Sequence, residues 1–182
     1  QRMTDFTAID SKIGEQMEGT IAELVRLCAQ PSVSAQGTGI RECADLTALM
    51  LRRRGFSVEI IPTKGHPVVF GEAPGDSDRT LLFYNHYDVQ PPEPLDLWDS
   101  PPFEPAIRDG KLYARGASDD KGHIQCRLAA LDAVKAVRGS YPCRIKFVIE
   151  GEEEIGSRNL APFVRENAAK LAADACVWEF GG

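Results

Sequence analysis

Residues 81–88 read Leu-Leu-Phe-Tyr-Asn-His-Tyr-Asp, an apolar and aromatic run that passes directly into polar residues. Four such residues without alternation are typical of a strand that is buried on both faces of a sheet. Similar apolar runs occur at 147–149 and at 176–178, and acidic residues follow each of them. These stretches predict central strands whose carboxyl ends carry functional side chains.

Helical periodicity alternates with the predicted strands. Apolar residues spaced about three or four apart predict helices over 17–29, 43–54, 120–137 and 159–171. Further strands are predicted over 56–61 and 68–71, and Asp109-Gly110 predicts the tight turn of a hairpin. The fold class is therefore α/β: a mixed, largely parallel sheet with helices on both faces.

The composition is that of an ordinary folded domain. The 182 residues are 43% hydrophobic and 26% charged, which is enough apolar material to bury a core. The formal net charge is −6 and no basic run is longer than residues 52–54, which argues against nucleic acid or a membrane as a partner. No apolar run approaches the roughly 20 residues of a membrane span.

The cysteines and the amino-terminal residues indicate in which cellular compartment the protein is expected. Five cysteines without a C-x-x-C pair indicate neither a disulfide framework nor a zinc knuckle, and are typical of small buried side chains in a reducing compartment. The first residues lack the apolar core of a signal peptide. We therefore expect a soluble, cytoplasmic protein.

Four groups of polar residues lie at the ends of predicted strands or at the start of a predicted helix. His86 and Asp88 follow one predicted strand, residues 150–154 follow another, Glu179 follows a third, and residues 118–120 precede the long helix. Function in open α/β sheets gathers at the carboxyl ends of strands and the amino ends of the following helices, so we expect these groups to converge.

The residue types at this point favour a metal. Carboxylates placed close together raise one another's pKa and resist ionisation, and a divalent cation removes that cost. One histidine among several carboxylates suits zinc or a related transition metal better than magnesium or calcium. The alternative is a set of solvated strand ends, with Asp119 or Asp120 as a helix cap and Glu152 as a surface acid.

Three segments resemble the successive signatures of the M20 family of metallopeptidases: residues 86–88 (His-Tyr-Asp), 115–122 (Arg-Gly-Ala-Ser-Asp-Asp-Lys-Gly) and 150–157 (Glu-Gly-Glu-Glu-Glu-Ile-Gly-Ser). Their occurrence together and in this order is far more specific than any one of them alone. Residues 87–91 and 109–113 most resemble the dipeptidase branch, which includes the carnosinases. The resemblance covers most of residues 81–179 and implies a zinc-exopeptidase-like α/β/α fold.

The resemblance also implies a site with two zinc ions, for which manganese or cobalt can substitute. By position, His86 resembles the ligand of the first zinc, Asp119 the bridging carboxylate, Glu154 the ligand of the second zinc, and Glu179 the residue that completes the first zinc's protein ligands. In this family the peptide bond after the bridging aspartate is often cis.

Two further residues are assigned to catalysis by the same resemblance. Asp88 resembles the carboxylate that orients the metal-bound imidazole. Glu153 resembles the general acid and base, which takes a proton from the attacking water and returns it to the leaving amine. Arg115 and Lys121 are candidates for binding a substrate carboxylate, but we expect them instead to neutralise the acidic cluster without contacting the metal or the substrate.

A second histidine ligand is missing from this pattern. Only His66 and His123 remain, and we expect neither to bind metal. In the family that histidine follows a separate lid and dimerisation domain. We therefore expect residues 1–182 to be the N-terminal part of a catalytic metallopeptidase domain, with the lid domain and the rest of the catalytic domain absent, and the full-length protein to be a homodimer through the absent domain.

These observations leave three functions open. The first is metal-dependent hydrolysis of dipeptides or short peptides. The second keeps the chemistry and changes the substrate, as in an N-acyl-amino-acid deacylase or a carboxypeptidase. The third is a catalytically silent metal-binding or interaction fragment, since truncation can leave this piece inactive. The expected partner in the first two cases is a small peptide or an acyl-amino acid.

Overall fold

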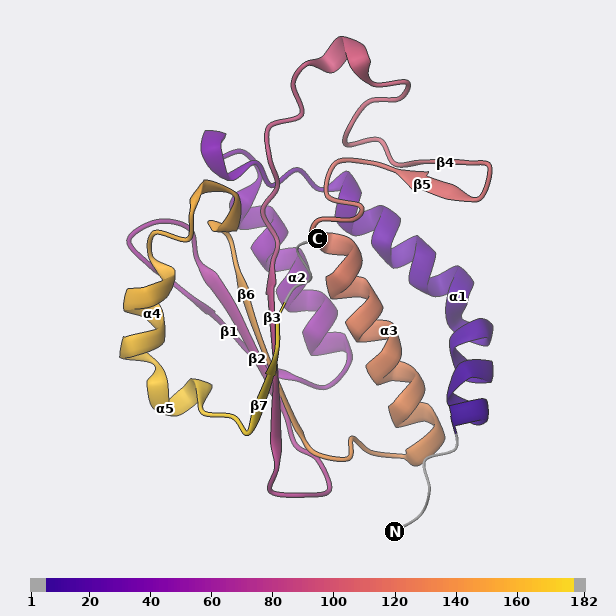
Figure 1. Cartoon of the computed structure of the whole chain (residues 1–182), viewed down its shortest axis with the longest axis vertical. Helices are drawn as coiled ribbons and strands as arrows, with labels where there is room; N and C mark the ends of the chain where they lie inside the picture. The colour runs from indigo at the N-terminus through magenta and orange to yellow at the C-terminus, as the bar shows by residue number, and fades with distance from the viewer. Residues whose placement is uncertain (1–5, 179–182) are drawn as a thin grey trace.

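A computed structural model describes residues 6–178 of the chain (Figure 1). The helices are α1 (Phe6–Ala29), α2 (Ile40–Arg53), α3 (Lys121–Arg138), α4 (Leu160–Glu166) and α5 (Ala168–Leu171), with short 3-10 turns η1 (Ser34–Gln36), η2 (Leu95–Leu97) and η3 (Glu153–Ile155). The strands are β1 (Ser57–Ile61), β2 (Val68–Ala73), β3 (Thr80–His86), β4 (Ala106–Arg108), β5 (Lys111–Tyr113), β6 (Arg144–Glu150) and β7 (Ala175–Val177).

The sheet is mixed, as predicted. Within the described residues its order is β1-β2-β6-β3-β7, with β3 parallel to both β6 and β7, and β2 antiparallel to both β1 and β6. The parallel half therefore contains the strands whose carboxyl ends were expected to carry the site. The separate hairpin of β4 and β5 turns at Asp109 and Gly110, and both have positive φ, as the sequence predicted.

Helices cover both faces of the sheet, which confirms the α/β class (Figure 1). The larger core lies on the face covered by α1, α2 and α3, where Leu27, Leu51, Leu128 and Phe147 are fully buried. A smaller core beneath α4 and α5 contains Val68, Phe70, Leu82, Tyr84, Val148 and Phe163. No helix among residues 6–178 is long and apolar enough to span a bilayer.

Two helices differ from their predicted bounds. Helix α1 begins at Phe6 rather than near residue 17, because the helix packs against α3 (Figure 1), although Gly14 and Gly19 interrupt its apolar pattern. The predicted helix over 159–171 is divided into α4 and α5 at Asn167, whose Nδ2 donates to the Phe163 carbonyl at 2.9 Å. Tertiary packing and a local side-chain bond thus override the helical periodicity.

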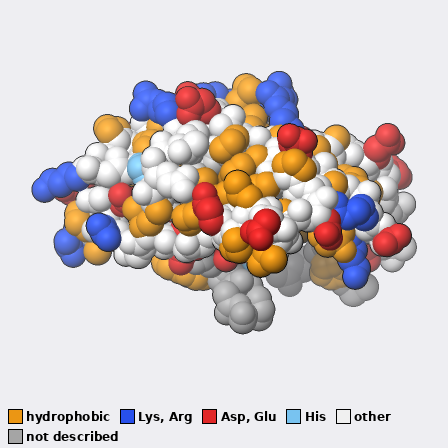
Figure 2. Space-filling model, turned by 90° about the horizontal axis from the view of Figure 1, so that it is seen from above, with side chains coloured by type: hydrophobic (Ala, Val, Ile, Leu, Met, Phe, Trp, Pro, Cys, Tyr) orange, Lys and Arg blue, Asp and Glu red, His pale blue; other side chains and the backbone are white. Residues whose placement is uncertain are grey.

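The proline-rich segment before the hairpin projects from the end of the molecule (Figure 1). Trp98 Nε1 donates to the Pro92 carbonyl at 2.8 Å, and the Arg115 guanidinium lies 5.3 Å from the Trp98 ring centroid. Leu95 and Leu97 remain 57% and 77% exposed. Trp98 therefore anchors the loop. The same end is seen from above in Figure 2, where hydrophobic side chains form a band across the middle of the face with acidic side chains among them.

Candidate metal and catalytic site

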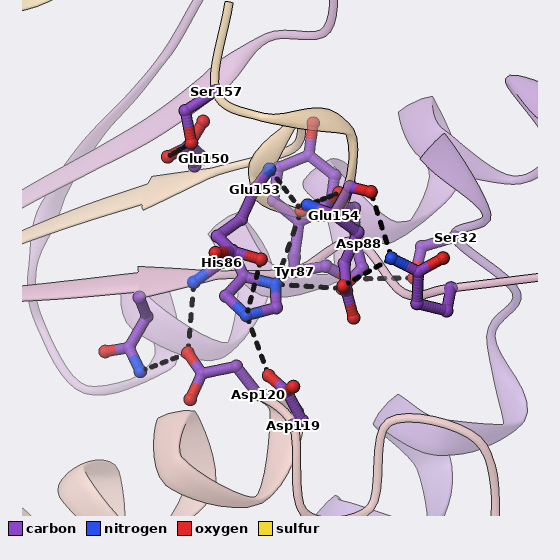
Figure 3. Close-up of polar contacts among 12 residues, drawn as sticks. Ser32, His86, Tyr87, Asp88, Asp119, Asp120, Glu150, Glu153, Glu154 and Ser157 are labelled. Atoms are coloured by element: carbon purple, nitrogen blue, oxygen red, sulfur yellow. Dashed lines mark hydrogen bonds and ion pairs between the residues drawn. The ribbon is translucent and has the colours of Figure 1, made fainter. Parts of the chain in front are cut away.

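The site forms where two parallel strands end. Strand β3 ends at His86 and strand β6 at Glu150, and these two residues are paired in register. The Tyr87 amide donates to the Glu150 carbonyl at 2.9 Å, which holds the two chains together one residue further. The turn η3 begins three residues after β6, so its acidic residues lie directly beside His86 (Figure 3).

The imidazole of His86 is 1% exposed and faces two carboxylates. Its Nε2 lies 2.9 Å from Oδ1 of Asp119 and 3.8 Å from Oε2 of Glu153. Its Nδ1 lies 3.0 Å from the Asp88 carbonyl oxygen. Because a carbonyl only accepts, we assign the proton to Nδ1, and the lone pair of a neutral ring is then on Nε2.

This donor set fits a divalent metal. A lone pair and two carboxylates that face one another repel unless a cation lies among them. Imidazole nitrogen with carboxylate oxygen is a ligand combination that zinc accepts. Residues 6–178 contain no cluster of three or more His, Cys, Asp or Glu side chains arranged to hold a metal, and the predicted ligand Glu179 lies outside the described residues. The described part of the site therefore supplies an incomplete ligand set.

Asp88 connects the histidine with the acidic turn. Its side chain is fully buried, and its carboxylate accepts hydrogen bonds from the backbone amides of Glu153 at 3.2 Å and Glu154 at 3.1 Å (Figure 3). Its carboxylate Oδ1 is 3.4 Å from His86 Nδ1, farther than its carbonyl oxygen. Asp88 thus contacts His86 chiefly through its backbone, and its carboxylate fixes the turn that carries Glu153 and Glu154.

Asp119 and Asp120 precede α3 and take different positions. The peptide bond between them is cis, as the resemblance led us to expect. Asp119 is 74% exposed and directed at His86. Asp120 is fully buried, and its Oδ2 accepts from Asn85 Nδ2 at 2.7 Å and from the His86 amide at 3.0 Å. Asp120 occupies the N-cap position of α3, as the helix-cap alternative has it, but its side chain makes no capping bond to the helix.

The acidic residues of the segment 150–154 also divide into two kinds. Glu150 accepts hydrogen bonds from the Tyr84 hydroxyl and from Ser157 Oγ, and Glu152 accepts from the His66 amide and from Asn159. Both are nearly fully buried, so the alternative of Glu152 as a solvated surface acid is wrong. Their carboxylates hold the loop together.

Glu153 and Glu154 are the acids that remain turned toward the site. Oε2 of Glu154 accepts from Gln90 Nε2 at 2.8 Å. Burial raises the pKa of Glu154, and the charges of Asp119 and Glu153 raise it further. A carboxylate in this position gains most from a nearby cation, because a cation restores its charged form.

The other two histidines are engaged elsewhere. His66 Nε2 lies 2.9 Å from the Ser34 carbonyl oxygen, and His123 Nδ1 lies 2.6 Å from Oδ1 of Asp120. Neither contact is with Asp119 or with Glu153. That neither ring binds metal stays a prediction.

The predicted role of Lys121 and Arg115 is wrong. Lys121 is fully buried, and its Nζ donates to the carbonyls of Leu27 at 3.1 Å and Gln30 at 2.6 Å, so it caps the carboxyl end of α1. Arg115 donates to the Pro91 carbonyl and stacks on Trp98. Both cations stabilise neighbouring chain segments rather than the acidic cluster.

Sequence reasoning also missed residues that support the site. Asn85 and Asp120 join the end of β3 to the start of α3, and Arg127 donates to Asn85 Oδ1 at 2.5 Å. The signal for Asn85 was present, because a polar residue inside an otherwise apolar strand needs partners when it is buried. Nothing in the sequence pattern marked Arg127, whose partners lie on two other elements.

The chain is similar to known proteins. A sequence profile described as Peptidase family M20/M25/M40 matches residues 82–182. The Cys-Gly metallodipeptidase dug1 of Schizosaccharomyces pombe is 33% identical over an alignment of 188 positions, which covers 94% of this chain and 39% of that protein. The succinyl-diaminopimelate desuccinylase of Dechloromonas aromatica is 36% identical over 139 residues, 76% of this chain and 36% of that protein.

A solved structure of an M20 family protein is also similar to this chain. The M20 family metallo-carboxypeptidase Sso-CP2 from Sulfolobus solfataricus matches with a TM-score of 0.85 and 39% identity, over 90% of this chain and 37% of that one. The chain thus spans between a third and two-fifths of the length of these relatives.

Proposed function

The chain belongs to the peptidase family M20/M25/M40, and on that premise we propose that it is part of the catalytic domain of a metal-dependent dipeptidase. The observation that carries the proposal is the position of His86 Nε2, 2.9 Å from Asp119 and 3.8 Å from Glu153. The dipeptidase relative supports this substrate class, because its similarity extends over 94% of the chain.

We assign the residues as follows. His86, Asp119, Glu154 and Glu179 hold zinc, with two ions per complete site and manganese or cobalt as substitutes. Zinc, when bound, polarises the scissile carbonyl and acidifies the attacking water. Glu153 takes the proton of that water and delivers it to the leaving amine. Asp88 keeps the proton of His86 on Nδ1 and holds the amides of Glu153 and Glu154.

The division of labour between the two neighbouring glutamates has a physical basis. A ligating carboxylate is held in its anionic form by the cation and cannot accept a proton readily. A neighbour that does not ligate is free to do so. The 3.8 Å separation of Glu153 from His86 Nε2 leaves it close to the metal position without committing it to a hydrogen bond with the ring.

A second candidate is a deacylase or carboxypeptidase with the same chemistry. It is favoured by the desuccinylase relative, which is 36% identical over 139 residues, and by the metallo-carboxypeptidase structure at 39% identity. The two candidates differ in what flanks the scissile amide: a free amino group in a dipeptide, or an acyl chain in an acyl-amino acid.

The test compares turnover and zinc content in the protein that carries this chain. Unblocked dipeptides and the matching N-acyl-amino acids serve as substrates, with Glu153→Gln as the variant and Glu42→Gln, an exposed acid on α2, as its control. We expect Glu153→Gln to lower kcat on dipeptides at least about 100-fold with zinc content unchanged. Cleavage of acyl-amino acids alone would favour the second candidate, and zinc binding without any hydrolysis would favour a silent fragment.

A further inference from the structure

Arg127 reaches from α3 to the ends of two strands. Its Nη1 donates to the carbonyl of Tyr84 and to Oδ1 of Asn85, both at the end of β3. Its Nη2 donates to the carbonyl of Trp178, the residue that follows β7, at 2.6 Å. One guanidinium therefore bridges the carboxyl ends of β3 and β7, directly before His86 in one chain segment and directly before Glu179 in the other.

The bridge continues into the site through buried groups. Asn85 receives from Arg127 at its Oδ1 and donates from its Nδ2 to Oδ2 of Asp120 at 2.7 Å. The same Oδ2 accepts from the His86 amide at 3.0 Å (Figure 3). Asn85 and Asp120 are fully buried. A buried network in which every member has a partner fixes its members in place, because breaking one bond leaves an unsatisfied group.

Strand β7 depends on such contacts more than the other strands of the five-stranded sheet do. It has three residues, all exposed, and among the described residues it pairs with β3 alone. Its amino end is fixed by Asp174, whose carboxylate accepts from the Thr80 amide at 2.8 Å and from Arg79 Nη1 at 2.9 Å. Its carboxyl end is fixed by Arg127 and by Trp178, which stacks on Tyr84 with ring centroids 3.8 Å apart.

We propose that Arg127 is a positioning residue, which holds the end of β7 beside His86 and thereby sets the metal affinity of the site. The claim that Arg127 sets the metal affinity rests on the proposed function. The claim that Arg127 holds the end of β7 does not, because the bonds of Arg127 to Asn85 and Trp178 are independent of any metal.

The test uses Arg127→Met, which keeps the length of the aliphatic stem and removes the guanidinium, and Arg127→Lys, which reaches fewer acceptors at once. Arg138→Met, in the last turn of α3, is the matched control, since Arg138 contacts only Asp76 at 3.9 Å among the described ion pairs. All are made in a Trp98→Phe background, so that Trp178 is the sole tryptophan among residues 1–182. Zinc affinity is measured by chelator competition, and Trp178 exposure by acrylamide quenching.

We expect Arg127→Met to weaken zinc binding about 10- to 100-fold, the range for residues that orient ligands, and to increase quenching of Trp178. The zinc affinity of Arg127→Lys should lie between those of Arg127→Met and the parent. The zinc affinity of Arg138→Met should stay within twofold of the parent's. Unchanged quenching, or unchanged zinc affinity beside a lower melting temperature, would overturn the positioning role. A parent protein that binds no zinc would overturn the proposed function, while the quenching comparison would still decide whether Arg127 anchors β7.

Discussion

The imidazole Nε2 of His86 lies 2.9 Å from Oδ1 of Asp119, although the two residues are 33 positions apart in the chain. This contact joins the end of β3 to the residues before α3. It exists because the buried Asp120, next to Asp119, accepts from the His86 amide and thus fixes the two chain segments against each other.

Zinc affinity should depend on the His86 ring and not on the His66 ring. We expect His86→Ala to weaken zinc binding by at least about 100-fold, because a ligand is lost rather than an orienting partner. His66→Ala should change it less than threefold, since the His66 ring contacts the Ser34 carbonyl instead. Calorimetric titration with zinc measures both. Equal losses in the two variants would refute the assignment of His86.

Asp88→Asn tests the link between the histidine and the acidic turn. The buried carboxylate accepts from two amides, and an asparagine offers one oxygen and one amino group in its place. One amide then loses its acceptor, so we expect unfolding free energy to fall by about 1–3 kcal/mol and zinc affinity to fall about 10- to 100-fold. The exposed Asp78→Asn is the control. Denaturant unfolding and zinc titration that match the parent would count against this role.

The ion pair of Glu23 with Arg54 predicts a defined pH dependence. Burial raises the pKa of Glu23, but hydrogen bonds from Arg54 and Gln125 and the charge of Arg54 lower it, and the result lies below the ordinary value of 4.5. A carboxyl group whose pKa is lower in the folded state than in the unfolded state stabilises the fold at pH values above its unfolded-state pKa. This stabilisation is lost as the pH falls through the folded-state pKa.

We therefore expect Glu23→Gln to lower the free energy of unfolding by about 1–2 kcal/mol at pH 7. The difference from the parent should shrink steadily as the pH is lowered below 4.5. Urea unfolding at several pH values measures it, with the exposed Glu18→Gln as the control. A difference that grew toward acid would have the wrong sign for this account.

Position 151 requires glycine because the Tyr87 side chain lies against its backbone. A Cβ at this position would lie 2.2 Å from the Tyr87 hydroxyl oxygen and 2.4 Å from its Cζ. Gly151→Ala should therefore destabilise the protein by about 1–3 kcal/mol. Gly14→Ala in α1, where nothing lies within 4 Å, should instead stabilise by about 0.5–1 kcal/mol. Thermal unfolding of both variants would contradict this reasoning if the two shifts had the same sign.

The sequence was sufficient to predict that the site lies at the carboxyl ends of β3 and β6. Apolar runs such as 81–84 require burial on both faces, and the polar residues that follow must then emerge at one edge of the sheet. The pairing of His86 with Glu150 is the direct result. The order of the motifs in the chain was enough to identify the family.

The spacing of charges alone does not predict which acids face the candidate site, and only the family resemblance singled out Glu153 and Glu154. Glu150 and Glu152 carry the same charge as Glu153, and only donors from other segments, such as Ser157 and Asn159, distinguish them. Lys121 shows the same limit, because its partners are the carbonyls at the end of α1, 91 and 94 positions away. Such contacts depend on the tertiary arrangement and leave no periodic signal.

Anomalous diffraction at the zinc edge, from crystals grown with zinc, tests the central claim most directly. The account predicts a peak about 2.0–2.2 Å from His86 Nε2 and from a carboxylate oxygen of Asp119. A peak at His66 or at His123 instead, or no peak beside His86, would contradict it.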